Sequence, residues 1–304
     1  MPGPLKLGEL SRTEVDGLLR GPGLYLQTGV FRFAIRSSFP EVAQALRRLY
    51  AAHDVAAEGE FADFHVRVDA PPLRKFLRPQ ARFYADGQTP FKPLPRAQAA
   101  AMLEWGMNWC ITAHAHQYLM LHAASLARDG WGLIMPAPPG SGKSTLAAAL
   151  CFRGWRLLSD ELTLLDPGNL DMAAVARPVS LKNASIEVIR SFVGDAVLSD
   201  TVRDTVKGTV AHLRPPAASV AAADALATPR WIVLPRYEAD APARLSPLPR
   251  ARAFMELAQN AFNYSLLGEA GFGALARLVD NCNCYQFCYG DLEEAVALFA
   301  ALAP

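Results

Sequence analysis

The stretch A-P-P-G-S-G-K-S-T, Ala137–Thr145, decides the fold predicted for this chain. An apolar, strand-like segment precedes it (Trp131–Met135), and an apolar, helix-like segment follows it (Leu146–Phe152). The stretch matches the pattern G-x-x-x-x-G-K-[ST] except at its first position, which is Ala137. Glycines let successive backbone N–H groups point at one anion, and the N-terminus of the following helix adds a favourable dipole. The sequence therefore predicts a phosphate-binding loop between a strand and a helix.

This predicted loop gives each polar group a role. Lys143 is expected to reach the terminal phosphates of a nucleotide, and the Ser144 hydroxyl to bind Mg²⁺. Ala137 is compatible with the loop if its φ is negative, because only a positive φ strongly favours glycine. The expected nucleotide-binding residues are Pro139, Gly140, Ser141, Gly142, Lys143, Ser144 and Thr145.

An acidic pair follows the next apolar segment. Arg156–Ser159 is predicted to be a short buried strand that ends at Asp160 and Glu161. A parallel strand beside the loop strand would place its carboxyl end next to the phosphates. One carboxylate can then hold Mg²⁺, while the other orients and deprotonates an attacking hydroxyl. The ordinary alternative is a solvated acidic turn.

At this point a family resemblance is visible. The segment PGSGKSTLAAALCFRGWRLLSDEL, Pro139–Leu162, resembles the core of the HPr kinase/phosphorylase family, in which an R-G-H-R-L-x-x-D-D strand follows the loop without gaps. Over most of its length the chain is more similar still to the bacterial "HPr-related kinase A" group, which is associated with exosortase systems. The segments that carry this likeness are R-P-V-S-L-K-N (Arg177–Asn183), F-N-Y-x-x-L-G (Phe262–Gly268) and Cys284-Tyr285.

The resemblance implies an α/β fold with a P-loop kinase core of the HPr kinase and phosphoenolpyruvate carboxykinase type. It implies ATP and Mg²⁺ as cofactors, with phosphoryl transfer to a serine hydroxyl of a protein or peptide. The family's catalytic base corresponds to Asp160, its second, metal-binding acid to Glu161, and a histidine near the transferred phosphate to His122. Because the related family forms oligomers, the resemblance leaves a homo-oligomer open.

The chain departs from the family pattern at three places. Glu161 replaces the second aspartate and is one methylene longer, and Ala137 replaces the first glycine of the loop. The later E-x-R-G-x-G signature is absent, since the only Arg-Gly pairs are Arg20-Gly21 and Arg153-Gly154. The resemblance therefore does not extend to HPr as the substrate or to the reverse phosphorolysis.

Further basic residues and cysteines are weaker candidates. Arg177 and Lys182 follow the acidic strand and are candidate contacts for phosphate or for the acceptor, with a solvated strand edge as the alternative. Arg214 lies in an Ala- and Pro-rich segment, residues 210–230, that is predicted to be a mobile loop able to close over the nucleotide. The cysteines Cys282, Cys284 and Cys288 lack the usual zinc-ligand spacing and are expected to be buried apolar side chains.

The remaining chain predicts a second module. Residues 1–91 are expected to form a small α+β N-terminal domain, with a hairpin around Thr28-Gly29 and a helix over Glu41–His53. The Pro-rich segment TPFKPLPR, Thr89–Arg96, predicts the boundary. Residues 92–304 are expected to form the kinase-like catalytic domain. It would begin with an apolar helix over Ala97–Ala115.

Composition bounds the partners and the location. The 304 residues contain 30 Lys plus Arg and 29 Asp plus Glu, a net charge of +1, which argues against a bulk electrostatic attraction to nucleic acid. No uninterrupted apolar stretch is long enough to span a membrane, and the first 20 residues contain no apolar signal segment. Five sparse cysteines are typical of reduced thiols, so a cytoplasmic protein is expected.

Three functions fit these observations. The leading interpretation is an ATP-dependent kinase acting on an unidentified protein or peptide hydroxyl, with Asp160, Lys143 and His122 as its catalytic residues. The second is a nucleotide-binding regulatory or assembly ATPase without an acceptor, which the missing substrate signature favours. A small-molecule kinase also stays open, because acceptor pockets leave no short motif.

Overall fold

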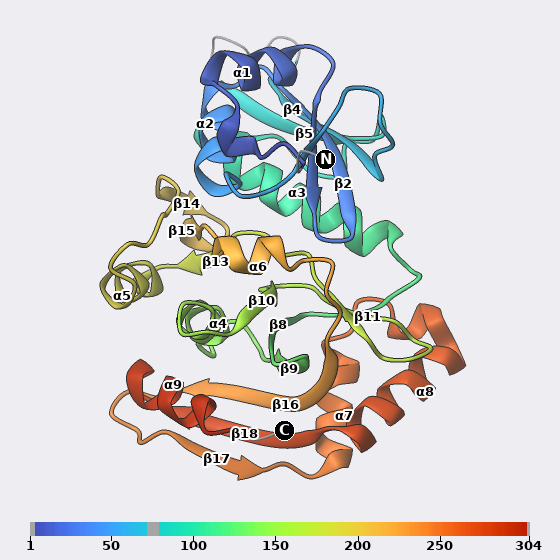
Figure 1. The fold of residues 1–304 in the computed structure, drawn as a ribbon, viewed down its shortest axis with the longest axis vertical. Helices are drawn as coiled ribbons and strands as arrows, with labels where there is room; N and C mark the ends of the chain where they lie inside the picture. The colour runs from blue at the N-terminus through green and yellow to red at the C-terminus, as the bar shows by residue number, and fades with distance from the viewer. Residues whose placement is uncertain (1–3, 72–78, 303–304) are drawn as a thin grey trace.

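The computed structural model describes residues 4–71 and 79–302, and its first part is built on a six-stranded sheet in the order β3-β1-β2-β4-β5-β6 (Figure 1). Helices α1 (Arg12–Arg20), α2 (Pro40–Leu49) and α3 (Ala99–His114) pack against one another and against this sheet. The strands are β1 (Leu24–Thr28), β2 (Phe31–Ser37), β3 (Val55–Ala56), β4 (Phe64–Asp69), β5 (Gln80–Ala85) and β6 (Leu94–Pro95). We call this sheet with its three helices the N-terminal layer.

Local sequence explains most of this layer. The predicted β1–β2 hairpin is confirmed, and it turns at Gly29, whose φ of 60° favours glycine. The predicted helix is also confirmed, but α2 ends at Leu49 rather than His53. Helix α1 was not predicted, although a capping box starts it. The Ser11 hydroxyl accepts from the Glu14 amide at 3.2 Å, and the Ser11 amide donates to the Glu14 carboxylate at 2.7 Å.

Helix α3 belongs to the N-terminal layer by its packing. It lies against β4 and β5, and β6, just before it, pairs with β5. A Cβ placed on Gly106 would lie 2.1 Å from the Phe83 ring, so the helix approaches β5 more closely than any larger residue allows. Residues after position 91 thus contact the N-terminal layer extensively, and the predicted boundary at residue 91 stays a prediction.

The second part of the chain is built on another six-stranded sheet, in the order β10-β8-β9-β16-β18-β17. Strands β8 and β9 form a hairpin, and its turn residues Asp129 and Gly130 have φ of 53° and 81°. Strand β9 pairs in parallel with β16, and β16 with β18. The strands are β8 (Ala123–Arg128), β9 (Trp131–Pro136), β10 (Arg156–Ser159), β16 (Thr228–Tyr237), β17 (Arg244–Pro247) and β18 (Asn283–Tyr289).

Helices cover both faces of this second sheet (Figure 1). Along β9 the side chains alternate, so Leu133 and Met135 pack toward one pair of helices and Ile134 toward the other. The first pair is α4 (Lys143–Cys151) and α9 (Leu292–Ala300), and the second pair is α7 (Arg250–Gln259) and α8 (Tyr264–Asn281). The result is a mixed α/β fold of helices, sheet and helices.

Strand β10 differs from the prediction in its neighbour. It does not pair with β9, because β8 lies between them and is antiparallel to both. Ser159 lies opposite Ser125, and Ser125 lies opposite Ile134. Since two antiparallel steps restore the direction, β10 still runs the same way as β9. Its carboxyl end therefore reaches the edge of the sheet where the loop after β9 begins.

The prediction of a mobile loop over residues 210–230 is wrong. This segment contains the end of β15 (Gly208–Leu213), helix α6 (Ala217–Ala221) and the start of β16. Strand β15 pairs with β13 (Val179–Lys182) and β14 (Val202–Thr205), and its apolar residues are buried. Alanine- and proline-rich composition misled the prediction, because it does not reveal the pairing of β15 with β13 and β14 or the contact of α6 with β10.

The remaining elements complete the second part. Strands β12 (Met172–Ala173), β11 (Thr163–Leu165) and β7 (Leu119–Leu121) form a small sheet, and α5 (Ala184–Phe192) follows β13. Within residues 4–71 and 79–302, no helix combines the length and apolarity needed to cross a membrane. The cysteines Cys282 and Cys284 are buried as expected, and Cys288 is half-buried.

The close contact of α3 with β5 makes a stability prediction. We expect Gly106→Ala to lower the free energy of unfolding by about 1–3 kcal/mol, because the added methyl overpacks the interface. Gly17→Ala in α1 is the matched control, since a Cβ there meets nothing within 4 Å among the residues that the structure describes. This control should gain up to about 1 kcal/mol from helix propensity. Urea unfolding measures both, and a Gly106→Ala variant as stable as the original protein would contradict the packing.

Candidate active site

The loop between β9 and α4 has the backbone that its glycines predict. Gly140 and Gly142 have φ of 89° and 85°, a region that other residues rarely adopt. Ala137 is absent from the residues with positive φ, which confirms that alanine fits at this position. A Cβ on Gly142 would also lie 2.3 Å from the Tyr289 hydroxyl. Gly142 is therefore required both by its φ and by the tyrosine beneath it.

Two strands of the sheet hold the loop from below. The Tyr289 hydroxyl on β18 donates to the Gly142 carbonyl at 3.0 Å, and the Tyr237 amide on β16 donates to the Ser141 carbonyl at 2.9 Å. The Gly142 carbonyl also accepts from the Leu146 amide at 2.9 Å, the first bond of α4. The Ser141 and Gly142 carbonyls are thus engaged in hydrogen bonds within the protein. The N–H groups of the first turn of α4 have no intrahelical partner and remain available to an anion.

Lys143 begins α4 and lies almost entirely out of solvent, with 8% of its surface exposed. Burial lowers the pKa of its ammonium group, while the negative charges of Asp160 and Glu161 act in the opposite direction. Lys143 of the loop therefore lies close enough to Asp160 and Glu161 for their charges to interact. The sequence predicted this proximity, although the lysine and the acidic pair come from different elements.

Asp160 follows β10 and is 4% exposed. Its Oδ2 accepts from the Ser180 amide at 3.0 Å, whereas its Oδ1 is buried without a hydrogen-bond partner among the described residues. Burial and, after it, the negative charge of Glu161 raise the pKa of this carboxyl to about 6, against the opposing effects of Lys143, the Ser180 amide and the Ser144 hydroxyl. Asp160 Oδ1 thus has no hydrogen-bond partner among the described residues, and the pKa of the carboxyl group is close to neutral pH.

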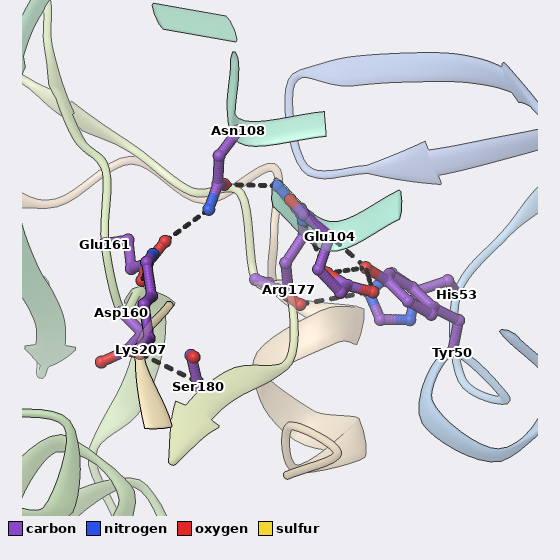
Figure 2. Close-up of polar contacts among 10 residues, drawn as sticks. Tyr50, His53, Glu104, Asn108, Asp160, Glu161, Arg177, Ser180 and Lys207 are labelled. Atoms are coloured by element: carbon purple, nitrogen blue, oxygen red, sulfur yellow. Dashed lines mark hydrogen bonds and ion pairs between the residues drawn. The ribbon is translucent and has the colours of Figure 1, made fainter. Parts of the chain in front are cut away.

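Glu161 lies in a different environment (Figure 2). Its Oε2 accepts from Asn108 Nδ2 at 2.5 Å, and its Oε1 lies 3.9 Å from Lys207 Nζ. Burial would raise the pKa of Glu161, but the positive charges of Lys207, Lys182 and Lys143 lower it. The pKa of Asp160 is therefore raised while that of Glu161 is lowered. In the pH range in which Asp160 gains or loses its proton, Glu161 remains ionised.

The predicted site residue His122 lies between β7 and β8 and is half-buried. Its ring stacks on Phe262 with ring centroids 5.7 Å apart, and its amide donates to the Asn260 carbonyl at 2.6 Å. Burial, followed by the charge of Lys143, lowers the pKa of His122 to about 4. The imidazole is therefore neutral at physiological pH and does not add to the positive charge of the site.

Three lysines from separate elements act on the acidic pair. Lys143 starts α4, Lys182 ends β13, and Lys207 occupies the turn between β14 and β15. The Lys207 ammonium also lies 5.6 Å from the centre of the Trp105 ring on α3. These cations converge on the edge of the sheet where β9 and β10 end, which makes this edge suitable for anions.

The remaining predicted contacts for phosphate or for the acceptor are Arg177 and Arg214. The Arg177 guanidinium is 7% exposed and is held by Glu104 at 2.6 Å and by Asn108 Oδ1 at 2.5 Å, with the Tyr50 hydroxyl at 3.4 Å. Arg177 therefore anchors α3. The charges that act on Glu161 come from Lys143, Lys182 and Lys207. Arg214 is half-buried just after β15, and its side chain forms no ion pair or hydrogen bond within residues 4–71 and 79–302.

No family model matches the chain, and no curated protein matches it in sequence. Among solved structures, the chain is similar to the structure of the Hpr(Ser) kinase/phosphatase from Coxiella burnetii. The sequence identity is 14% and the TM-score is 0.26, and the alignment covers 60% of this chain and 95% of that chain. At this level of likeness, nothing about the activity of the present chain follows.

Several residues around the site were missed by sequence reasoning. Asn108 and Trp105 come from α3, which the sequence predicted only as an apolar helix. A signal was present, because Glu104 and Asn108 are polar residues one turn apart on an otherwise apolar helix. Lys207 and Tyr289 carried no signal of their own, since each reaches the site only through the pairing of distant strands.

The burial of Arg177 generates a second prediction. We expect Arg177→Met to lower the free energy of unfolding by about 3–5 kcal/mol, because the buried Glu104 carboxylate loses its partner. Replacing Glu104 by leucine as well should recover much of this loss. Arg190→Met is the control, because its pair with Glu187 lies on the surface. Thermal and urea unfolding give the comparison, and an equal small effect of both single variants would contradict an anchoring role for Arg177.

Proposed function

We propose that this chain is a P-loop kinase that transfers the γ-phosphoryl group of ATP to a hydroxyl of a protein or peptide, with a serine as the expected acceptor. The observation that carries the proposal is the arrangement of Asp160. It is a buried carboxyl with one unpartnered oxygen, beside the lysine of a glycine-rich loop. We also propose the family relation suggested by the sequence, to HPr kinase/phosphorylase and the HPr-related kinase A group.

The residues present fit ATP and Mg²⁺. The positive φ of Gly140 and Gly142, the free N–H groups at the start of α4 and the three lysines suit a polyphosphate. Oxygen ligands are what Mg²⁺ prefers, and the Ser144 hydroxyl and the ionised Glu161 carboxylate are the groups that would hold it. When bound there, the metal ion would offset negative charge on the phosphates.

Asp160 is the proposed base. A pKa of about 6 leaves this carboxyl ionised at neutral pH, yet more basic than an ordinary aspartate. The Ser180 amide fixes one oxygen, so the other oxygen has a defined direction in which to accept the proton of an acceptor hydroxyl. As the hydroxyl loses its proton to Asp160, its oxygen would attack the terminal phosphorus of ATP, and the bond from that phosphorus to the β,γ-bridging oxygen would break to release ADP.

The positive groups are proposed to stabilise charge on the transferred group. Lys143 and the N–H groups from Gly140 to Ser144 would face the phosphates, and Lys182 and Lys207 extend the positive field along the same edge. His122, neutral at physiological pH, can donate or accept a hydrogen bond there without adding charge. Arg214 stays a candidate for an additional contact.

The alternative function is a nucleotide-dependent regulatory or assembly ATPase without an acceptor. One observation favours it, namely the hydrogen bond between Glu161 and Asn108, which connects the site to the N-terminal layer. A small-molecule kinase would use the same groups with a different acceptor. For each of these functions we propose a cytoplasmic location, in keeping with five free cysteines, and no nucleic-acid partner; self-association is left to measurement.

The decisive variant is Asp160→Asn. We expect it to reduce phosphoryl transfer by at least about 100-fold while nucleotide binding is retained, because the amide keeps the shape and loses the proton acceptor. The assay incubates the protein with γ-labelled ATP, Mg²⁺ and host lysate and follows label in polypeptides. Asp195→Asn, an exposed aspartate after α5, is the matched control. Undiminished transfer by Asp160→Asn would refute the assignment of the base, and free phosphate as the sole labelled product would favour the ATPase.

The same carboxyl predicts a pH dependence. Because Asp160 acts in its ionised form, kcat/KM for the nucleotide should fall as the pH decreases through about 6, and tenfold per pH unit below that. Glu161→Gln removes the neighbouring negative charge, so the acid limb of any residual activity should move to lower pH. Steady-state rates between pH 4.5 and 8 test this, and a kcat/KM that stays nearly constant down to pH 4.5, as for a base with the ordinary aspartate pKa of 3.8, would contradict it.

A further inference from the structure

A continuous line of hydrogen bonds joins Glu161 to the N-terminal layer (Figure 2). The Tyr50 hydroxyl, at the end of α2, donates to the Glu104 carboxylate, 2.8 and 2.9 Å from its two oxygens. Glu104 accepts from Arg177 Nη2 at 2.6 Å, and Arg177 Nη1 donates to Asn108 Oδ1 at 2.5 Å. Asn108 Nδ2 then donates to Glu161 Oε2 at 2.5 Å. The line crosses from one part of the fold to the other through side chains of α3.

The network fixes the orientation of the Asn108 amide. A guanidinium can only donate hydrogen bonds, so the oxygen of Asn108 must face Arg177. An ionised carboxylate can only accept, so the nitrogen must face Glu161. Both requirements are met by one rotamer and neither by the flipped amide. Asn108 therefore presents a donor to Glu161 in a fixed direction.

Glu161 has a particular need for such a contact. Its side chain has one more rotatable bond than aspartate would have, and 21% of it is exposed, so packing alone does not determine its position. Its other oxygen is engaged at the longer distance of 3.9 Å by Lys207, whose own side chain is 41% exposed. Asn108 is thus the short, directional contact that determines where the carboxylate lies.

We propose that Asn108 is a positioning residue for Glu161, and that the N-terminal layer takes part in the reaction by supplying Asn108 from α3, with its amide oriented by Arg177, which Glu104 and Tyr50 hold in turn. This rests on the proposed function, because it assigns Glu161 to a divalent cation. Residues that hydrogen-bond to a metal ligand orient it, and their loss costs about 10–100-fold in metal affinity. The small N-terminal layer then has a function in addition to its own folding, although it contributes no group to the phosphate loop.

The test measures Mn²⁺ binding directly, without turnover. Electron paramagnetic resonance reports free Mn²⁺ during titration of the whole protein with a non-hydrolysable ATP analogue present. We expect Asn108→Leu to weaken Mn²⁺ binding about tenfold or more, because the carboxylate loses its orienting donor. Thr112→Val is the matched control, since its hydroxyl bonds only to the carbonyls of Asn108 and Trp109 within α3. Asn108→Ser replaces Asn108→Leu if the leucine variant does not fold.

A double-mutant cycle with Glu161→Gln separates positioning from a general structural effect. If Asn108 acts through Glu161, the Asn108 variant should weaken Mn²⁺ binding no further in the Glu161→Gln background. An equal loss in both backgrounds, or unchanged Mn²⁺ affinity in the folded Asn108 variant, would overturn the inference and leave the proposed function standing. A parent protein that binds neither the nucleotide analogue nor Mn²⁺ would instead overturn the proposed function, and the inference with it.

Discussion

Two adjacent carboxyl groups, Asp160 and Glu161, are kept largely out of water at the end of one short strand, and the surrounding structure is arranged to compensate for them. Burying a carboxylate is costly unless it is paired or hydrogen-bonded. Compensation comes from a helix start with Lys143, from the Ser180 amide on β13, from the turn that carries Lys207, and from Asn108 on α3. These partners belong to segments far apart in the sequence, so the site exists only when both parts of the fold are assembled.

How well each feature could be predicted depends on how far apart in the sequence the interacting residues lie. The loop with Gly140 and Gly142 and the hairpin that turns at Gly29 are local features, and local sequence signals predicted them. The neighbour of β10 was not predicted, because strand order depends on pairing between distant segments. The segment after residue 210 was misjudged for a related reason. Alanine and proline indicate a loop by composition, yet this segment is ordered by the pairing of β15 with distant strands and by the contact of α6 with β10.

The candidate site shows the same division. Lys143, Asp160 and Glu161 were identified because a motif places them at fixed spacing, whereas Asn108 and Lys207 reach Glu161 from a helix and a hairpin turn without any motif. Arg177 was predicted from its position after the acidic strand as a contact for phosphate or for the acceptor. The structure shows its guanidinium paired with Glu104 on α3, a partner that no motif indicated. Sequence spacing predicts which groups are near the chemistry and not which way they face.

The identity of the cations has a consequence of its own. The chain has 30 basic residues and only six of them are lysines, yet Lys143, Lys182 and Lys207 all act on Glu161. An arginine in place of Lys207 would offer a rigid, planar fork that matches both oxygens of a carboxylate at once. The Lys207 ammonium, on a flexible side chain, lies 3.9 Å from Glu161 Oε1 and forms no such bidentate contact. Most of the positive charge in this chain is thus carried by arginine, whereas the charges that act on Glu161 are lysines. Lysine suits a site where anionic groups must be able to exchange partners, because it is a compact charge on a flexible side chain.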